Sequence, residues 1–324
     1  MTMEPGSEPR HAPDERDGQA GAADRRRPEP SPIFVVGTAR SGTTWVGNLL
    51  ASHPAVFAAT APEHHGVIES HLLDYTRYAM PGRMSAEEFI DRYEAEDYFR
   101  SLGLSRSTFL RSSGGESADV IAHFTTMMRV AAEAHDARYW LEKTPRHAIY
   151  VDEILTRFPR ARFVAVERDR MRTVRGQVVA FQTPGKSGVR TVVEKSLRYA
   201  SDVRGVERLV GGAQDACIVV KYEDLASDFD KETNRLLRFL GLEPHALSSR
   251  FERYSSVPLG ADGTPPWLDR MLVPFCATTA RFVPFWVMRR LRVRRDAAHG
   301  TGGAYYTRMA ASSGEGGDPT TWAR

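Results

Sequence analysis

The stretch 34–50, FVVGTARSGTTWVGNLL, limits the fold more than any other part of the sequence. The apolar run 33–37 is typical of a strand buried in a parallel sheet. A turn rich in Gly, Ser and Thr follows, and 43–51 continues with helical spacing until it meets Ser52, His53 and Pro54. We therefore predict a strand, a loop and a helix in direct succession.

Three further segments favour the same type of fold. RFVAVE at 162–167 and CIVVKY at 217–222 have the pattern of strands that follow helices, and RYWLEK at 138–143 is a weaker strand candidate. Strands that alternate with helices predict an α/β fold: a parallel sheet between two layers of helices, with a P-loop-like nucleotide site at the carboxyl ends of the strands. The segment 80–133 has an irregular helical pattern, and we expect it to form the acceptor pocket.

Length and composition indicate one folded domain with two loose ends. A chain of 324 residues that is 41% hydrophobic can bury a sizeable core, which we place at 31–295. The segment 1–30 mixes charge, Pro, Gly and Ala with almost no large apolar side chain, so it is predicted to be a disordered tail without a secretory signal. The Gly- and Ser-rich segment 296–324 is predicted to be a flexible tail.

Charge and cysteine content narrow the functional classes. The net charge of +3 and the pI near 8.9 arise from an excess spread along the chain, which favours an anionic ligand over a nucleic-acid surface. Cys217 and Cys276 are the only cysteines and both lie in apolar runs, so a cytoplasmic protein without a disulfide framework is the default expectation.

The turn after the first predicted strand departs from a nucleotide triphosphatase loop at one position. Gly37 and Gly42 have the spacing of G-x-x-x-x-G-K-[ST], but Thr43 stands where the lysine belongs, which disfavours triphosphate chemistry. A turn that enters a helix still offers free backbone N–H groups, and Arg40 adds a fixed positive charge. The loop is therefore a candidate anion cradle, although such a turn can also simply join a strand to a helix.

Four segments together carry a resemblance to a known family. R-S-G-T-T-W at 40–45 resembles the 5′-phosphosulfate loop of sulfotransferases that use 3′-phosphoadenosine 5′-phosphosulfate (PAPS). WLEKTP at 140–145 resembles the family's K-T-P element, and FVAVERDRMRTVRG at 163–176 resembles its 3′-phosphate strand and helix. VKYEDL at 220–225 and FLGL at 239–242 resemble its last strand and helix. These segments also occur in the order that they have in the family. Within the family, the chain resembles the bacterial type.

The resemblance implies a set of cofactor-binding residues. Arg40 and the N–H groups of Ser41, Gly42, Thr43 and Thr44 would hold the phosphosulfate.

Two aromatic residues have two interpretations each. Trp45 would stack on the adenine, or it is a core residue at the start of the helix. Tyr222 would line the cofactor site, or it packs against the next helix.

The 3′-phosphate pair of the family is only half present. Arg168 stands where the family has its phosphate-binding arginine, but Arg170 replaces a proline and Gly176 occupies the position of a serine. The resemblance therefore implies that Arg168 holds the 3′-phosphate. Its second donor would be the Gly176 amide, Arg172 or Arg175.

The remaining implied residues concern chemistry. Lys143, in the K-T-P element, would offset charge on the sulfuryl group or on the leaving phosphate. Glu63, in TAPEHHG, is the leading candidate for the general base, with His64 and His65 as rivals. Sulfuryl transfer of this kind needs no metal, so we expect none.

The resemblance predicts a sulfotransferase but leaves the acceptor open. A glycan, a glycolipid, a small molecule or a peptide tyrosine could supply the hydroxyl. The alternatives are a P-loop kinase or nucleotide triphosphatase and a non-catalytic nucleotide-binding protein.

The segment 271–295, MLVPFCATTARFVPFWVMRRLRVRR, has three interpretations: core, a membrane-spanning helix, or an interfacial segment. Two prolines and Arg281 interrupt the apolar part, which disfavours a span. As an interfacial segment it would make peripheral membrane contact through the following residues: Phe282, Phe285, Trp286, Arg289, Arg290, Arg292, Arg294 and Arg295.

Overall fold

The computed structural model describes residues 28–94, 96–181, 188–248 and 266–301. Its centre is a five-stranded parallel sheet with the order β2-β7-β1-β8-β9. The strands are β1 (Ser31–Gly37), β2 (Val56–Ala58), β7 (Tyr139–Lys143), β8 (Arg162–Glu167) and β9 (Cys217–Lys221). The predicted α/β class is confirmed. The edge strand β2 was not predicted, and the last strand ends one residue early because Tyr222 begins a helix.

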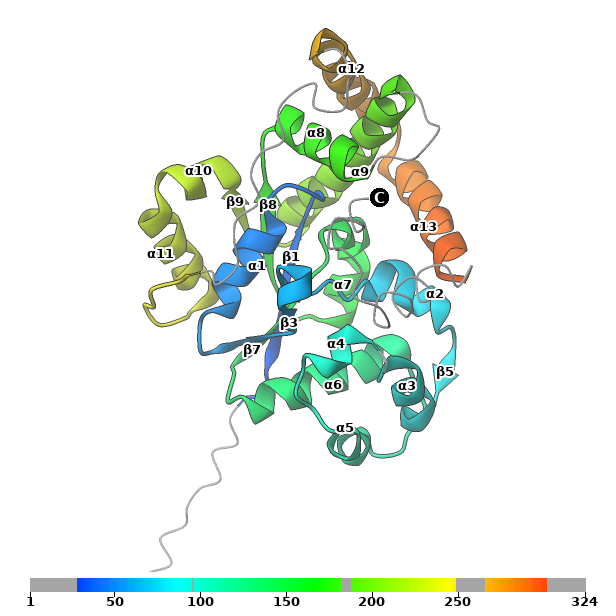
Figure 1. The fold of residues 1–324 in the computed structure, drawn as a ribbon, viewed down its shortest axis with the longest axis vertical. Helices are drawn as coiled ribbons and strands as arrows, with labels where there is room; N and C mark the ends of the chain where they lie inside the picture. The colour runs from blue at the N-terminus through cyan, green and yellow to red at the C-terminus, as the bar shows by residue number, and fades with distance from the viewer. Residues whose placement is uncertain (1–27, 95, 182–187, 249–265, 302–324) are drawn as a thin grey trace, which may run out of the picture.

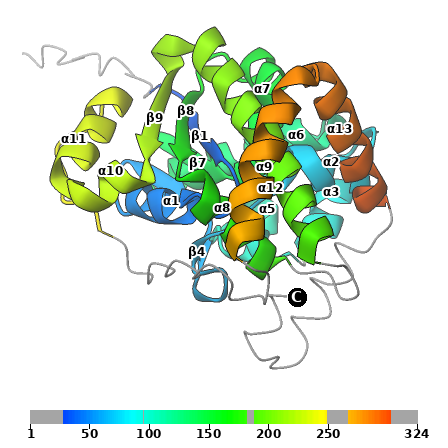
Figure 2. The same cartoon turned by 90° about the horizontal axis from the view of Figure 1, so that it is seen from above.

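Helices cover both faces of this sheet (Figures 1 and 2). One face carries α1 (Thr43–Ala51), α10 (Tyr222–Ser227) and α11 (Phe229–Leu240). The other face carries α6 (Val120–Ala134), α7 (Val151–Arg157) and α9 (Gly188–Gly212). The helix α8 (Arg170–Ala180) follows β8 at the carboxyl edge of the sheet and packs on α9.

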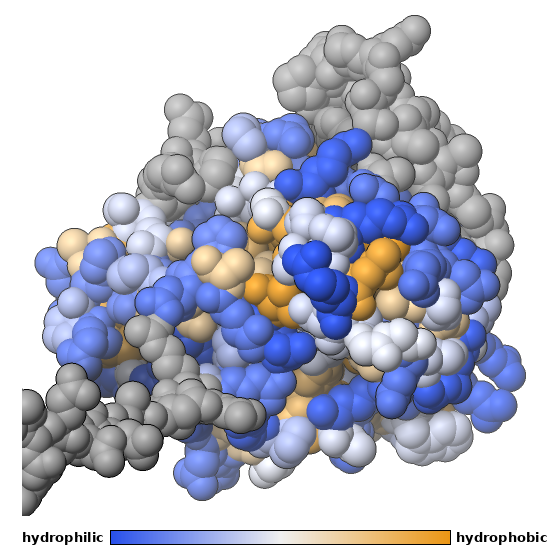
Figure 3. Space-filling model, turned by 90° about the horizontal axis from the view of Figure 1, so that it is seen from below, coloured by the Kyte–Doolittle hydropathy of each residue, from blue (hydrophilic) through white to orange (hydrophobic). Residues whose placement is uncertain are grey.

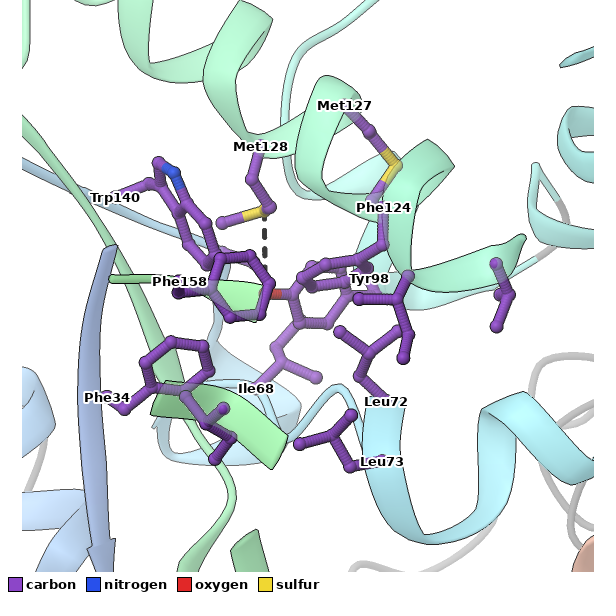
Figure 4. Packing of buried hydrophobic residues seen from close by; sticks show 14 of the residues in the cluster. Phe34, Ile68, Leu72, Leu73, Tyr98, Phe124, Met127, Met128, Trp140 and Phe158 are labelled. Carbon is purple, nitrogen blue, oxygen red and sulfur yellow. Dashed lines mark hydrogen bonds between the residues drawn. The ribbon is translucent and has the colours of Figure 1, made fainter. Parts of the chain in front are cut away.

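The alternation of side chains along β1 divides the core in two. Ile33 and Val35 point into an aliphatic cluster with α1 and α11, whereas Phe34 and Val36 point into a larger cluster with α6, α7 and α9. The rings of Phe34 and Trp140 lie 5.9 Å apart between centroids, and both lie against Phe158, as Figure 4 shows. All residues of β1 from Pro32 to Gly37 are buried, which explains its continuous apolar run.

The chain between β2 and β7 adds a small lobe beside the sheet. It begins with the hairpin β3 (Thr60–Ala61) and β4 (Gly66–Val67), which the Asn48 side chain ties to α1 by bonding to Val67 N and His65 O. The helical part predicted for 80–133 is confirmed, except that it also contains one short strand pair. Between the β3–β4 hairpin and α6 the lobe contains η2 (Leu72–Thr76), α2 (Arg77–Ala79), β5 (Arg83–Met84), α3 (Ala86–Tyr93), α4 (Asp97–Arg100), α5 (Arg106–Ser113) and β6 (Ala118–Asp119).

Two C-terminal helices complete the described structure. The first, α12 (Pro266–Thr279), packs on α8 and α9, and α13 (Phe285–Thr301) runs from there along the side of the molecule to η2 and α2 (Figure 1). Buried Asp296 accepts a hydrogen bond from the Tyr150 hydroxyl at 2.8 Å and is paired with Arg146. The predicted start of a flexible tail at 296 is therefore wrong, because this carboxylate anchors α13. The part of that tail from 302 onward and most of the predicted N-terminal tail lie outside the described residues.

A buried ion pair fastens α12 to α8, and it provides a stability test. Arg175 and Asp269 are 2.9 Å apart and both side chains are fully buried. Asp269→Ala would leave the guanidinium buried without this partner, so we expect a loss of roughly 3–5 kcal/mol of unfolding free energy in urea denaturation. The double variant Arg175→Met/Asp269→Leu removes both charges and should regain most of that loss. Equal losses in both variants would contradict the ion-pair explanation.

Candidate active site

The loop after β1 has the geometry of an anion cradle. Gly42 has a φ of 104° and caps the N-terminus of α1, so the first N–H groups of that helix point out of the turn. The Ser41 side chain is fully buried, and its Oγ has no hydrogen-bond partner among the residues that the structure describes. A buried hydroxyl beside free helical N–H groups fits an anionic group bound in this turn.

Arg40 enters the same turn from a backbone conformation that non-glycine residues rarely adopt. Its φ is 69°, in the left-handed region. Its side chain lies against Gly176 of α8, where a Cβ would come within 3.2 Å of the Arg40 Cβ. A serine at position 176 would therefore crowd Arg40. Gly176 is the seventh residue of α8, so its N–H belongs to the helical ladder, which disfavours it as the second phosphate donor.

Arg168, Tyr222 and Trp45 form a stack beside the loop. The Arg168 guanidinium lies 4.1 Å from the Tyr222 ring centroid, and its Nη1 donates to the Arg40 carbonyl oxygen at 3.3 Å. The same ring presses on Gly42, where a Cβ would come within 2.6 Å of it. The structure thus brings Arg168, directly after β8, and Tyr222, directly after β9, to the loop that follows β1.

The half-buried Trp45 packs within the protein. Its ring lies edge-on to Tyr222 at 5.4 Å and is stacked on Phe229 at 6.3 Å. These contacts fit the core interpretation of this residue, and the adenine contact stays a prediction.

Arg172 and Arg175 are the two side chains predicted as possible second donors to the 3′-phosphate, and one of them already has a buried partner. Arg175 is held by Asp269 in the buried pair described above. Arg172 is exposed on the first turn of α8, where its backbone N–H bonds to the capping side chain of Asp169 at 2.9 Å. Arg172 is therefore the better placed of the two.

Lys143 lies at the carboxyl end of β7, as predicted, and is only 3% exposed. Its Nζ is 2.9 Å from Oε1 of Glu69, a residue that the sequence analysis did not select. Partial burial raises the pKa of Glu69, but the charges of Lys143 and His71 outweigh it and hold this pKa below its usual value. Glu69 is therefore an ionised carboxylate beside the lysine at neutral pH.

A network of buried polar side chains contacts Glu69 through His71. His71 lies between two carboxylates, with Nε2 3.4 Å from Glu69 and Nδ1 3.0 Å from Asp74. His147 contacts Glu142 at 2.9 Å, and its Nε2 lies 3.7 Å from Asp74. Burial lowers the pKa of His147, but these two carboxylates outweigh it and raise the pKa to about 9. These contacts between the histidines and the carboxylates hold the carboxylates in place.

The predicted base lies at a different place. Glu63 is exposed on η1 (Pro62–His64), at the tip of the β3–β4 hairpin. His64 lies 3.3 Å from Asp97 at the start of α4, and His65 is held at the hairpin by its backbone carbonyl, which accepts from Asn48. Glu69, by contrast, lies directly against Lys143, one of the predicted catalytic residues.

The sequence contained one signal that could have identified Glu69. In I-E-S-H-L-L-D, a glutamate, a histidine and an aspartate stand at 69, 71 and 74, next to the apolar residues Ile68, Leu72 and Leu73. Buried titratable residues concentrate at functional sites, because burying them is costly unless they are paired.

A strand, a glycine turn that leads into a helix, and basic side chains at the carboxyl ends of parallel strands define a P-loop-like α/β protein. The sulfotransferase family model matches residues 32–246, and the chain belongs to that family. No curated protein matches the chain.

Solved sulfotransferase structures also match the chain, with little sequence identity. The sulfotransferase domain of the curacin biosynthetic pathway is 17% identical, with a TM-score of 0.46, and the match covers 67% of this chain and 75% of that domain. A sulfotransferase from Alicyclobacillus acidocaldarius is 17% identical, with a TM-score of 0.45, and the match covers 82% of this chain and 96% of the other. Sulfotransferase STF9 from Mycobacterium avium is 17% identical, with a TM-score of 0.43 and coverage of 68% and 66%.

Proposed function

We propose that this sulfotransferase takes a sulfuryl group from PAPS and transfers it to a hydroxyl of an acceptor. The observation that carries the proposal is the meeting of four features at one edge of the sheet: the anion loop with its unpartnered Ser41 Oγ, Arg40, Arg168 and the Lys143–Glu69 pair. The loop and Arg40 suit the phosphosulfate. Arg168, on the neighbouring strand, suits the 3′-phosphate.

The Lys143–Glu69 pair suggests how the chemistry divides between the two residues. Glu69 accepts the proton of the acceptor hydroxyl, whose oxygen forms a bond to sulfur. The bond from sulfur to the bridging phosphate oxygen breaks, and its electron pair leaves with 3′,5′-ADP. Lys143 and Arg40 stabilise the charge that develops on the leaving phosphate. We propose Glu69 as the base in place of Glu63, because it is the carboxylate that contacts Lys143.

Differential ligand stabilisation tests the cofactor. A ligand that binds only the native state raises its stability, so 3′,5′-ADP should raise the melting temperature while ATP with Mg²⁺ should not. Stabilisation by ATP with Mg²⁺ alone would favour a kinase or nucleotide triphosphatase instead. Turnover of sulfur-labelled PAPS with a panel of hydroxyl acceptors then separates an enzyme from a nucleotide-binding protein.

Arg168 gives a sharper binding prediction. Arg168→Ala should weaken binding of 3′,5′-ADP by at least about tenfold and leave binding of 5′-AMP within a few-fold, because only the former carries the 3′-phosphate. Isothermal titration with both nucleotides measures this difference. The control Arg172→Ala tests whether the exposed arginine of α8 is the second donor. Equal losses of both ligands in Arg168→Ala would show that Arg168 supports the loop through Tyr222 instead.

A further inference from the structure

The outer side of α12 carries a row of large apolar side chains. Trp267, Met271 and Phe275 are spaced by four residues and are 63%, 56% and 64% exposed. The opposite side of α12 packs on α8 and α9 through Asp269, Val273 and other small residues. Three exposed side chains of this size on one helical stripe are unusual for a surface that faces only water.

The turn between α12 and α13 extends this surface. Phe282 is 84% exposed and Trp286 66% exposed, and both lie at the break where the two helices meet at 109°. Arg204 of α9 donates to the Ala280 and Val283 carbonyl oxygens, which fixes the turn to the domain. No single helix in the described chain has the length and hydropathy of a membrane span, and only the two bent helices together reach that threshold.

The arginines of α13 divide between its two sides. Arg292 pairs with buried Asp202 at 3.2 Å, Arg289 donates to the Ile149 carbonyl at 3.1 Å, and Arg295 pairs with Glu194 at 3.1 Å. Arg292 is therefore buried away from any lipid surface, whereas the Arg295 side chain is still 44% exposed. Arg290 and Arg294, on the same stripe as Trp286, remain exposed.

The charged residues on the exposed side of these two helices are all basic. Arg270 and Arg281 are exposed next to the apolar row, in addition to Arg290, Arg294 and Arg295 of α13. Asp269 and Asp296 are the only acidic residues in 266–301, and both are fully buried. In the view of the molecule from below, hydrophilic residues cover most of the described surface, with a few apolar residues between them (Figure 3). Exposed aromatics framed by arginines without a carboxylate match an anionic lipid surface.

We propose that the exposed side of α12 and α13 docks on anionic membranes. Phe275, Phe282 and Trp286 enter the headgroup boundary, while the exposed arginines contact lipid phosphates. The buried Arg175–Asp269 pair joins α12 to α8, which begins at the carboxyl edge of the sheet. The membrane would therefore lie at the same end of the molecule as the candidate active site. This docking does not depend on the proposed reaction.

Co-sedimentation of the full chain with vesicles tests the proposal. The protein should bind vesicles of phosphatidylcholine and phosphatidylglycerol in low salt, release in high salt, and ignore vesicles of phosphatidylcholine alone. Arg281→Gln/Arg290→Gln should weaken binding by about 30-fold, at roughly 1 kcal/mol per arginine. The control Arg92→Gln/Arg111→Gln removes two exposed charges from α3 and α5 and should leave binding unchanged.

The apolar contribution needs a second pair of variants. Phe282→Ser/Trp286→Ser should lose vesicle binding while the melting temperature stays unchanged, because both side chains are exposed. Failure of the wild type to bind anionic vesicles at low salt would overturn the proposal. So would a dimer in lipid-free solution that this variant dissociates, because a second copy would then cover the surface. Equal losses of vesicle binding in Arg92→Gln/Arg111→Gln and Arg281→Gln/Arg290→Gln would also overturn it, because binding would then depend on the overall charge of the protein and not on this surface.

Discussion

Glu69→Gln should lower the rate of sulfuryl transfer by roughly 100-fold or more while binding of 3′,5′-ADP stays close to normal. The amide keeps the shape of the side chain and can still contact Lys143, but it cannot accept the acceptor proton. Single-turnover rates with saturating labelled PAPS, measured with an acceptor found by screening, give the effect on the chemical step. Nucleotide titration in parallel shows whether the site is still assembled.

Matched variants separate Glu69 from the other candidate bases. Glu63→Gln and His64→Ala change exposed or hairpin residues and should retain near-normal rates. Because the pKa of Glu69 lies below its usual value, kcat/KM should not fall on account of this group between pH 8 and about pH 5. A histidine base of ordinary pKa would lose rate below about pH 6.5. Such a loss, together with an active Glu69→Gln, would return the role to the hairpin.

Arg40→Ala should reduce transfer by roughly 100- to 1000-fold, because it removes a fixed charge directed at the phosphosulfate. The backbone at position 40 is in the left-handed region, and alanine has the same difficulty there as arginine, so the loop has no new reason to change shape. The steady-state rate of Arg40→Ala should therefore fall strongly, while its melting temperature should fall only slightly.

Two comparisons sharpen the test of Arg40. Arg40→Lys keeps a positive charge but loses the planar fork of donors, so it should recover only part of the rate. Arg111→Ala removes an exposed arginine from α5 and should have no effect on transfer. A folded Arg40→Ala enzyme with a normal rate would show that the loop amides alone hold the anion.

Local pattern was sufficient for the elements that surround the loop. The helix at 43–51 and the strand at 162–167 have in the structure the limits that their periodicity predicts. A buried strand must be apolar along its length, and a phosphate turn needs glycine where φ is positive, so both leave a trace in neighbouring residues. The short strand β2 left no such trace, since three residues are too few for a period.

Contacts between distant segments were beyond what the sequence could determine. By itself it determined the parallel α/β class, the succession of strand, loop and helix at 31–51, and the family, because each depends on residues close together in the chain. Only the tertiary structure decided that Glu69 meets Lys143, 74 residues away, and that Gly176 makes room for Arg40. It also decided which arginines of α13 turn inward. The physical reason is that such meetings depend on strand order and on helix packing, which bring together side chains that no local period relates.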